Sequence, residues 1–445
     1  MTYVLHRSTK TDFQVAVAGE GSWLTLAGGL HVLDASGGAA VACIGHGNRR
    51  VAEAIADQAT KVAYVHTLFF SSEPAEELAD HMIAISGGAF ARAFFVSSGS
   101  ESMDSAIKMG LQYHIERGEP DRQIFIARRQ SYHGNTFGAL AASGHAARRS
   151  IYEPVLMRNF SHVSPCFPYH YQPEGQDDET YVAALAAELE AEILRLGPAN
   201  VAGFIAETIV GATSGCAVAT PGYFKAVREI CDRYGILWIA DEIMCGMGRT
   251  GRTHAWEWEG ASPDIQTVAK GLGGGYVPIG AMLIAPKVLE VLTAGTGSFV
   301  HGHTYQAHPV ATRGALEVQR IITEQALVAN VADLGPKLTD RLQQHFGQHP
   351  HVGEIRGRGF FQALEFVSDR ESKTPFAPDV AFSDRLKRAA LEAGLAIYPN
   401  GGTIDGKTGD HVIIAPPFNA TEDELDQICD RLGTALDATV ASLRG

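Results

Sequence analysis

The sequence predicts an α/β fold with a large domain, in which helices sandwich a mainly parallel sheet, and a smaller α+β domain. Two observations predict it. Short apolar runs alternate with longer amphipathic stretches through the middle of the chain, which is typical of a parallel sheet covered by helices. The two ends lack this alternation, and 445 residues are enough for more than one core. We therefore expect a large domain over 55–312 and a small domain formed by 1–54 and 313–445.

Four apolar runs are the clearest predicted strands, and polar residues follow each of them. The runs are Ala93–Val96 before Ser97–Ser100 and a helix from about Glu101, Ile124–Ile126 before Tyr132–Gly134, Ala202–Ala206 before Glu207, and Ile236–Ala240 before Asp241. Open α/β sheets bind their ligands at the carboxyl ends of the strands. The sequence therefore predicts a site at that edge of the sheet.

The other elements follow from turn and capping residues. Thr220 is expected to cap a helix that has Pro221 in its first turn and runs to about Tyr234. The chain should begin with a hairpin formed by Trp23–Leu26 and His31–Leu33. A long helix is predicted over Arg313–Leu334, where Gly335-Pro336 should end or kink it, and Phe167–Thr180 should be an exposed loop.

Composition excludes several classes of protein. The formal net charge is −14 and no Lys/Arg-rich block occurs, which argues against a nucleic-acid-binding protein. No apolar run reaches the length of a bilayer span, and Met1–Lys10 lacks the apolar core of a signal peptide. The 6 cysteines are scattered without a C-x-x-C pair, which is typical of reduced thiols. We expect a cytoplasmic enzyme that contacts neither nucleic acid nor membrane.

Asp241 is the first candidate catalytic residue. A carboxylate directly after an apolar strand is partly shielded from water, although such residues more often cap a helix or form a salt bridge. Here Asp241 opens the segment D-E-I-M-C-G-M-G-R-T-G, whose glycines allow the backbone to approach a ligand closely. Both interpretations stay open on this segment alone.

Lys270 is the second candidate. It follows Val268-Ala269 and precedes a glycine-rich run, so its amine lies among apolar and small residues. Such surroundings lower the pKa of a lysine and suit imine chemistry. The alternative is a lysine that reaches solvent beside a flexible turn, and the local sequence does not separate the two.

Three other motifs have structural as well as functional interpretations. Ser98-Gly99-Ser100 precedes a helix and either binds a phosphate or only caps that helix. Tyr132-His133-Gly134 either stacks on a flat cofactor or packs in the core. His301, His303 and His308 lack a nearby acidic ligand, so no metal site is expected there.

Taken together, the motifs resemble those of the class III (omega) aminotransferases of pyridoxal-phosphate fold type I. The resemblance extends from about Asp34 to Phe418. It rests on D-E-x-x-x-G-x-G-R-T-G from Asp241, A-K-G-L-G-G-G around Lys270, S-G-S-E from Ser98, Y-H-G from Tyr132, E-T-I-V-G-A from Glu207 and A-P-P-F at 415–418. It implies a seven-stranded type of sheet and pyridoxal 5′-phosphate as cofactor.

The resemblance also implies a role for each matching residue. Lys270 would form the internal aldimine with the cofactor and move the proton during conversion to pyridoxamine phosphate. Asp241 would pair with the pyridinium nitrogen. The other implied cofactor contacts are Gly99 and Ser100 at the phosphate, Tyr132 and Ile243 on the ring faces, His133, Glu207, and Thr304 from a neighbouring subunit. The role of Thr304 implies a homodimer with shared active sites. Thr208 stands where the family usually has proline after Glu207, a departure that puts the role of Glu207 in question.

The substrate-binding residues depart from the family pattern. Asn135 stands where members that use 2-oxoglutarate often have arginine. The stretch Y-P-N-G-G-T-I-D-G stands where some amine–pyruvate members carry a mobile arginine upstream of the C-terminal P-P motif. Ala39 and Ala40 are small, whereas Leu68 and Phe69 keep one wall of the expected pocket apolar. We expect a small oxo-acid acceptor of the pyruvate or glyoxylate type and an amino donor with an apolar or terminal-amine end.

Other functions remain open on sequence alone. Decarboxylating transaminases, aminomutases and racemases share the Asp/Lys pair, because the cofactor supplies their common chemistry. A nucleotide-binding oxidoreductase would need a G-x-G-x-x-G fingerprint, which G-L-G-G-G does not match. A non-catalytic relative would need neither Lys270 nor Asp241.

Overall fold

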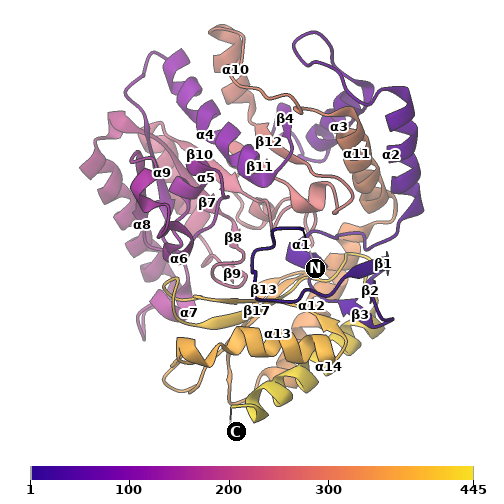
Figure 1. The fold of residues 1–445 in the computed structure, drawn as a ribbon. Helices are drawn as coiled ribbons and strands as arrows, with labels where there is room; N and C mark the ends of the chain where they lie inside the picture. The colour runs from indigo at the N-terminus through magenta and orange to yellow at the C-terminus, as the bar shows by residue number, and fades with distance from the viewer. Residues whose placement is uncertain (1–2, 444–445) are drawn as a thin grey trace.

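A seven-stranded sheet forms the centre of the molecule in the computed structural model, which describes residues 3–443 (Figure 1). Its strands are, in spatial order, β4 (Arg92–Val96), β12 (Gly280–Ile284), β11 (Ile265–Val268), β10 (Leu237–Asp241), β7 (Val201–Glu207), β5 (Ile124–Arg128) and β6 (Phe160–Val163). Neighbours from β11 to β6 pair in parallel, and β12 is antiparallel to both of its neighbours. The prediction of a mainly parallel sheet is confirmed.

Both faces of this sheet are buried, which is why its strands are continuous apolar runs. Successive residues of β10 point to opposite faces. Trp238 and Ala240 pack in a core with α8 (Asp178–Leu196) and α9 (Tyr223–Tyr234). Leu237 and Ile239 pack in a second core with α4 (Gly99–Glu116) and α10 (Pro286–Ala294). All four predicted strands lie in this sheet.

The two ends of the chain share one core. Strands β1 (Ala16–Glu20), β2 (Trp23–Leu26) and β3 (His31–Asp34) form a sheet with β15 (Leu395–Ala396). A second sheet has the order β13 (Val352–Arg358), β14 (Phe361–Phe366), β17 (Asp410–Ile414), β16 (Tyr398–Gly401). Helices α12 (Leu327–Phe346), α13 (Phe382–Glu392) and α14 (Glu422–Ala441) pack with residues of both ends (Figure 1). The predicted hairpin is confirmed. The domain boundaries, 55–312 and 1–54 with 313–445, stay a prediction.

Shorter elements connect these layers. The remaining helices and turns are α1 (Gly37–Ala40), α2 (Arg49–Lys61), α3 (Glu73–Ala84), α5 (Phe137–Ala142), α6 (Ala146–Arg149), α7 (Pro168–Tyr171), α11 (Pro309–Glu324), and the 3₁₀ turns Glu153–Val155, Pro198–Asn200, Ala255–Trp258, Lys270–Leu272 and Pro378–Val380. Strands β8 (Ile209–Val210) and β9 (Ala217–Val218) form a small hairpin. No helix within residues 3–443 is long and apolar enough to cross a membrane.

Three details differ from the prediction. Helix α9 begins at Tyr223 and its N-cap is Gly222, whose φ of 91° is left-handed, so Thr220 does not cap it. The predicted helix over Arg313–Leu334 is two helices, because the chain turns at Ala326, which has a φ of 51°. The predicted loop Phe167–Thr180 contains α7, and its first residue Phe167 is fully buried.

The predicted effect of Gly335-Pro336 is to end or kink the helix. The helix does not end there, because Pro336 lies inside α12. Gly335 packs closely against the backbone of Gly359, so an added Cβ at Gly335 would lie 2.6 Å from the Cα of Gly359. Tertiary packing therefore keeps α12 helical through Gly335-Pro336, a pair that ordinarily ends a helix.

Candidate active site

A cavity of about 520 Å³ opens at the carboxyl ends of five strands of the central sheet. Ser97, Tyr132, Glu207, Asp241 and Ala269 line it, and they lie at or just beyond the ends of β4, β5, β7, β10 and β11. The opposite wall comes from both ends of the chain, with Gly38, Ala39 and Val41 near α1 and Tyr398 on β16. The polar residues that follow the predicted strands therefore do meet at one site.

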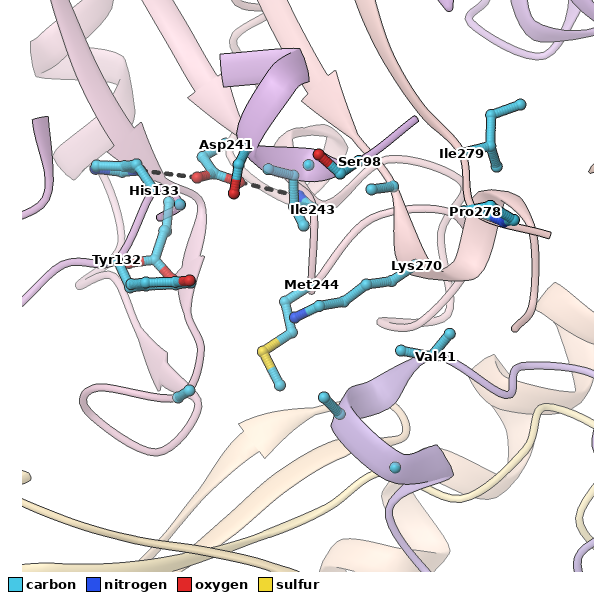
Figure 2. Close-up of a pocket in the computed structure, with 18 of the residues that line it drawn as sticks. Val41, Ser98, Tyr132, His133, Asp241, Ile243, Met244, Lys270, Pro278 and Ile279 are labelled. Carbon is cyan, nitrogen blue, oxygen red and sulfur yellow. Dashed lines mark hydrogen bonds and ion pairs between the residues drawn. The ribbon is translucent and has the colours of Figure 1, made fainter. Parts of the chain in front are cut away.

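Lys270 extends its side chain across this cavity (Figure 2). It follows β11 in a short 3₁₀ turn and has a φ of 45°, in the left-handed region. Burial lowers the pKa of the Lys270 amine, although the nearby carboxylates of Asp241 and Glu207 oppose this effect. A larger fraction of the amine is therefore neutral than in an exposed lysine.

Asp241 is the last residue of β10, and its side chain is only 4% exposed. The Nδ1 of His133 donates to Oδ2 over 2.7 Å, and the backbone N–H of Ile243 donates to Oδ1 over 3.0 Å. Both bonds are drawn in Figure 2. They fix the direction of the carboxylate at the wall of the cavity.

Glu207, the last residue of β7, also lines the cavity. Its carboxylate accepts hydrogen bonds from the backbone N–H groups of Tyr132, over 3.0 Å, and Gly211, over 2.9 Å. Burial and the nearby Asp241 raise the pKa of Glu207. Thr208, in place of the family's proline, donates from its hydroxyl to the buried Glu242 over 2.9 Å.

The turn before α4 forms a concave cradle at the same cavity. Ser98 caps the helix by accepting from the N–H of Glu101 over 3.3 Å, so the structural interpretation of this serine is correct. Gly99 lies so close to Ile243 that an added Cβ would be 2.9 Å from its side chain. The first backbone N–H groups of α4 have no partner within the helix, so they would stabilise a negatively charged ligand bound there.

Comparison with known proteins identifies the family. The family model for class-III aminotransferases matches residues 4–436. An uncharacterized aminotransferase of Schizosaccharomyces pombe is 46% identical over 441 residues, which cover 99% of this chain and 96% of that protein. The chain belongs to the class III aminotransferase family.

One further relative and one solved structure are also similar to this class III aminotransferase. Gamma aminobutyrate transaminase 3, chloroplastic, of Solanum lycopersicum is 33% identical and covers 97% of this chain and 82% of its own length. The structure of the omega transaminase from Pseudomonas jessenii in complex with PMP matches with a TM-score of 0.92 at 33% identity. That match covers 99% of this chain and 97% of the other. The fold is that of the omega transaminases, pyridoxal-phosphate fold type I.

The structure brings together most of the residues that the sequence singled out. The predicted residues that line the cavity are Ala39, Gly99, Ser100, Tyr132, His133, Glu207, Asp241, Ile243 and Lys270. The set offers an amine, a fixed carboxylate, helix-start amides and aromatic and aliphatic walls, which fits a phosphorylated heteroaromatic cofactor.

Five predicted residues lie elsewhere in the single chain. Ala40 is buried, while Leu68 and Phe69 are 81% and 75% exposed. The side chain of Asn135 accepts a hydrogen bond from the Ser100 hydroxyl over 2.8 Å, and Thr304 is exposed. Their substrate or inter-subunit roles stay predictions.

Sequence reasoning did not select two arginines at the cavity, Arg7 and Arg148. The guanidinium carbon of Arg148 lies 4.7 Å from the centre of the Tyr132 ring. Arg148 lies in the four-residue helix α6, whose sequence A-A-R-R is typical of a surface turn. Only the folded structure shows that Arg148 lines the cavity whereas Arg149 does not. Within residues 3–443 no cluster of three or more potential metal ligands occurs.

Proposed function

We propose that this class III aminotransferase binds pyridoxal 5′-phosphate in the cavity and transfers an amino group from an amine or amino acid to a small oxo-acid. The observation that carries the proposal is that Lys270 and Asp241 reach the same cavity, beside the glycine cradle at the start of α4. Pyridoxal phosphate supplies an aldehyde that condenses with amines and a ring that accepts electrons from the substrate carbon.

Gly99 and Ser100 hold the phosphate in this proposal. They are the first two residues of an 18-residue helix, where free N–H groups and the helix dipole favour an anion. Gly99 leaves room because it lacks a Cβ, and Ile243 occupies the adjacent wall.

Asp241 keeps a proton on the ring nitrogen of the cofactor. A buried carboxylate favours the protonated form of a neighbouring nitrogen base, and His133 and the Ile243 N–H hold this carboxylate in one orientation. His133 thereby acts as a positioning residue. Tyr132 and Ile243 confine the ring between an aromatic and an aliphatic side chain.

Lys270 anchors the cofactor and then moves the proton. Its amine would take a proton from the substrate carbon when neutral and, once charged, would deliver it to the C4′ carbon of the cofactor, so a pKa lowered by burial suits both steps. The cavity walls from α1 and Tyr398 would limit the access of water to this exchange.

The acceptor is of the pyruvate or glyoxylate type, and the donor has an apolar or terminal-amine end. Small residues at Gly38 and Ala39 leave space near the cavity wall, and Asn135 is engaged with Ser100. The similarity to a gamma aminobutyrate transaminase agrees with a terminal-amine donor. More activity with 2-oxoglutarate than with pyruvate would contradict the acceptor.

The enzyme forms a homodimer with shared active sites, in which Thr304 reaches the cofactor of the other subunit. Leu68, Phe69 and Phe70 form a run of large apolar side chains that are 81%, 75% and 66% exposed, which is unusual for a surface that faces water. Analytical ultracentrifugation should give twice the mass of the chain. A monomer that is fully active would contradict this part of the proposal.

The central experiment follows the visible absorption of the reconstituted enzyme as single amines are added. Loss of the absorption band and formation of the keto product without carbon dioxide supports amino transfer. Pyruvate or glyoxylate should then restore the band. Carbon dioxide release, or an isomerised amino acid in place of a keto product, would point to another reaction of the same cofactor.

A further inference from the structure

The cavity contains two arginines that have no acidic partner. Arg148 lies on α6 and Arg7 lies in the exposed N-terminal segment. Within residues 3–443 the guanidinium of neither residue forms an ion pair or a hydrogen bond, and the Nε of Arg148 is buried without a partner. A guanidinium carries five N–H donors and stays charged, so a half-buried one without a partner is a strong candidate for ligand binding.

The neighbouring residue Arg149 shows the contrast. Its guanidinium donates to the carbonyl of Ala141 over 2.7 Å, to that of Ser143, and to the carboxylate of Glu153 over 3.1 Å. Arg149 therefore holds α6 against the segment 141–143 at the end of α5. Arg148, on the same short helix, makes no such bond and lies over the ring of Tyr132.

The acidic groups of the cavity do not balance this charge. Asp241 is held by His133 and the Ile243 N–H, and Glu207 is held by the N–H groups of Tyr132 and Gly211. Among residues 3–443 no ion pair joins either carboxylate to an arginine. The guanidiniums of Arg148 and Arg7 are therefore not taken up by these carboxylates and can attract an anionic group of the substrate.

We propose that Arg148 binds the carboxylate of the substrate, with Arg7 adding a second positive charge at the mouth of the cavity. The inference rests on the proposed function and extends it. A guanidinium matches a carboxylate with two parallel hydrogen bonds, and contact with the Tyr132 ring limits its movement. Arg148 would thus supply the charged carboxylate contact that some family members have from an arginine at the position of Asn135.

The consequence concerns substrate choice. The oxo-acid acceptor and an amino-acid donor each present a carboxylate to the same arginine in successive half-reactions. A donor amine without a carboxylate gains nothing from Arg148. The enzyme should therefore prefer amino acids to amines of the same shape.

The test compares alanine with 2-aminopropane, in which a methyl group replaces the carboxylate. In the reconstituted enzyme Arg148→Gln should slow the half-reaction with alanine by roughly 10- to 100-fold and that with 2-aminopropane by less than about threefold. Arg148→Lys should fall between the wild type and Arg148→Gln. Arg158→Gln removes an exposed arginine outside the cavity and is the matched control.

A binding experiment separates this inference from the proposed function. Propanoate has neither an amino nor an oxo group, so calorimetric titration of the reconstituted enzyme measures carboxylate binding without turnover. Wild type should bind propanoate more tightly than propanamide, and Arg148→Gln should lose that preference. Equal effects of Arg148→Gln on both amines, or an unchanged propanoate affinity, would overturn the role of Arg148. Failure of the wild type to react with any amine would instead contradict the proposed function.

Discussion

His133 donates from Nδ1 to Oδ2 of Asp241 over 2.7 Å, and the two side chains are 0% and 4% exposed. A hydrogen bond to a buried charge is worth about 1.5–3 kcal/mol, so this contact fixes the carboxylate firmly. We expect His133→Leu to lower kcat roughly 10- to 100-fold and to weaken cofactor binding, because Asp241 loses its orientation. His133→Asn retains a donor and should recover part of both. Cofactor titration and steady-state kinetics measure these effects, and a wild-type cofactor affinity in His133→Leu would argue against a positioning role.

Lys270→Ala should reduce turnover by a factor on the order of 10³ or more, since no other lysine of residues 3–443 lines the cavity. Reduction with borohydride followed by mass spectrometry should find cofactor attached to Lys270 in the wild type and none in the variant. Lys225→Ala, which removes an exposed lysine on α9, is the control. Cofactor trapped on a different lysine would contradict the assignment.

Gly99→Ala should weaken cofactor affinity by roughly 10-fold, because the new methyl group would lie 2.9 Å from the side chain of Ile243. The double variant Gly99→Ala/Ile243→Ala removes the clash. If crowding is the cause, titration should show less loss in the double variant than the sum of the two single losses. Simple additivity would show that Gly99 matters for another reason.

Stability should fall in mild acid because of His411, which is fully buried. Burial lowers the pKa of His411 to about 3, and its Nδ1 lies 2.7 Å from the Thr403 hydroxyl. The unfolded chain protonates this histidine below a pH of about 6.5 whereas the folded chain does not, so stability present at neutral pH is lost as the pH falls.

The size of this effect is about 1 kcal/mol between pH 7.5 and 5.5. Urea unfolding at the two pH values measures it, and His411→Asn should show a smaller difference than wild type. The exposed His31→Asn is the control and should keep the wild-type difference. An equal pH dependence in wild type and His411→Asn would refute the contribution of His411.

The sequence was informative where apolar periodicity and motif spacing act locally. Trp238 and its neighbours predicted a buried strand, and Asp241 at its end predicted a side chain at the sheet edge; both are confirmed. The family motifs also led to Lys270 and Gly99 in one cavity. These predictions hold because strand burial and the carboxyl edge of a parallel sheet follow general rules.

Other features depend on tertiary contacts that leave little trace in the sequence. Ala326 adopts a left-handed φ of 51° between α11 and α12, although alanine favours helix continuation. Pro336 stays within α12, where packing overrides its tendency to end a helix. Arg148 was missed because its role depends on the distance between α6 and Tyr132, which only folding creates.

The cavity wall combines Arg7 and Ala39 with Tyr398. During synthesis on a ribosome, the segments that carry Asp241 and Lys270 emerge well before Tyr398 does. The pocket therefore cannot close while the chain is still growing past residue 270. A chain truncated before Tyr398 would lack this wall of the cavity, and a ligand that needs the complete cavity would bind only after that residue has been made and folded into place.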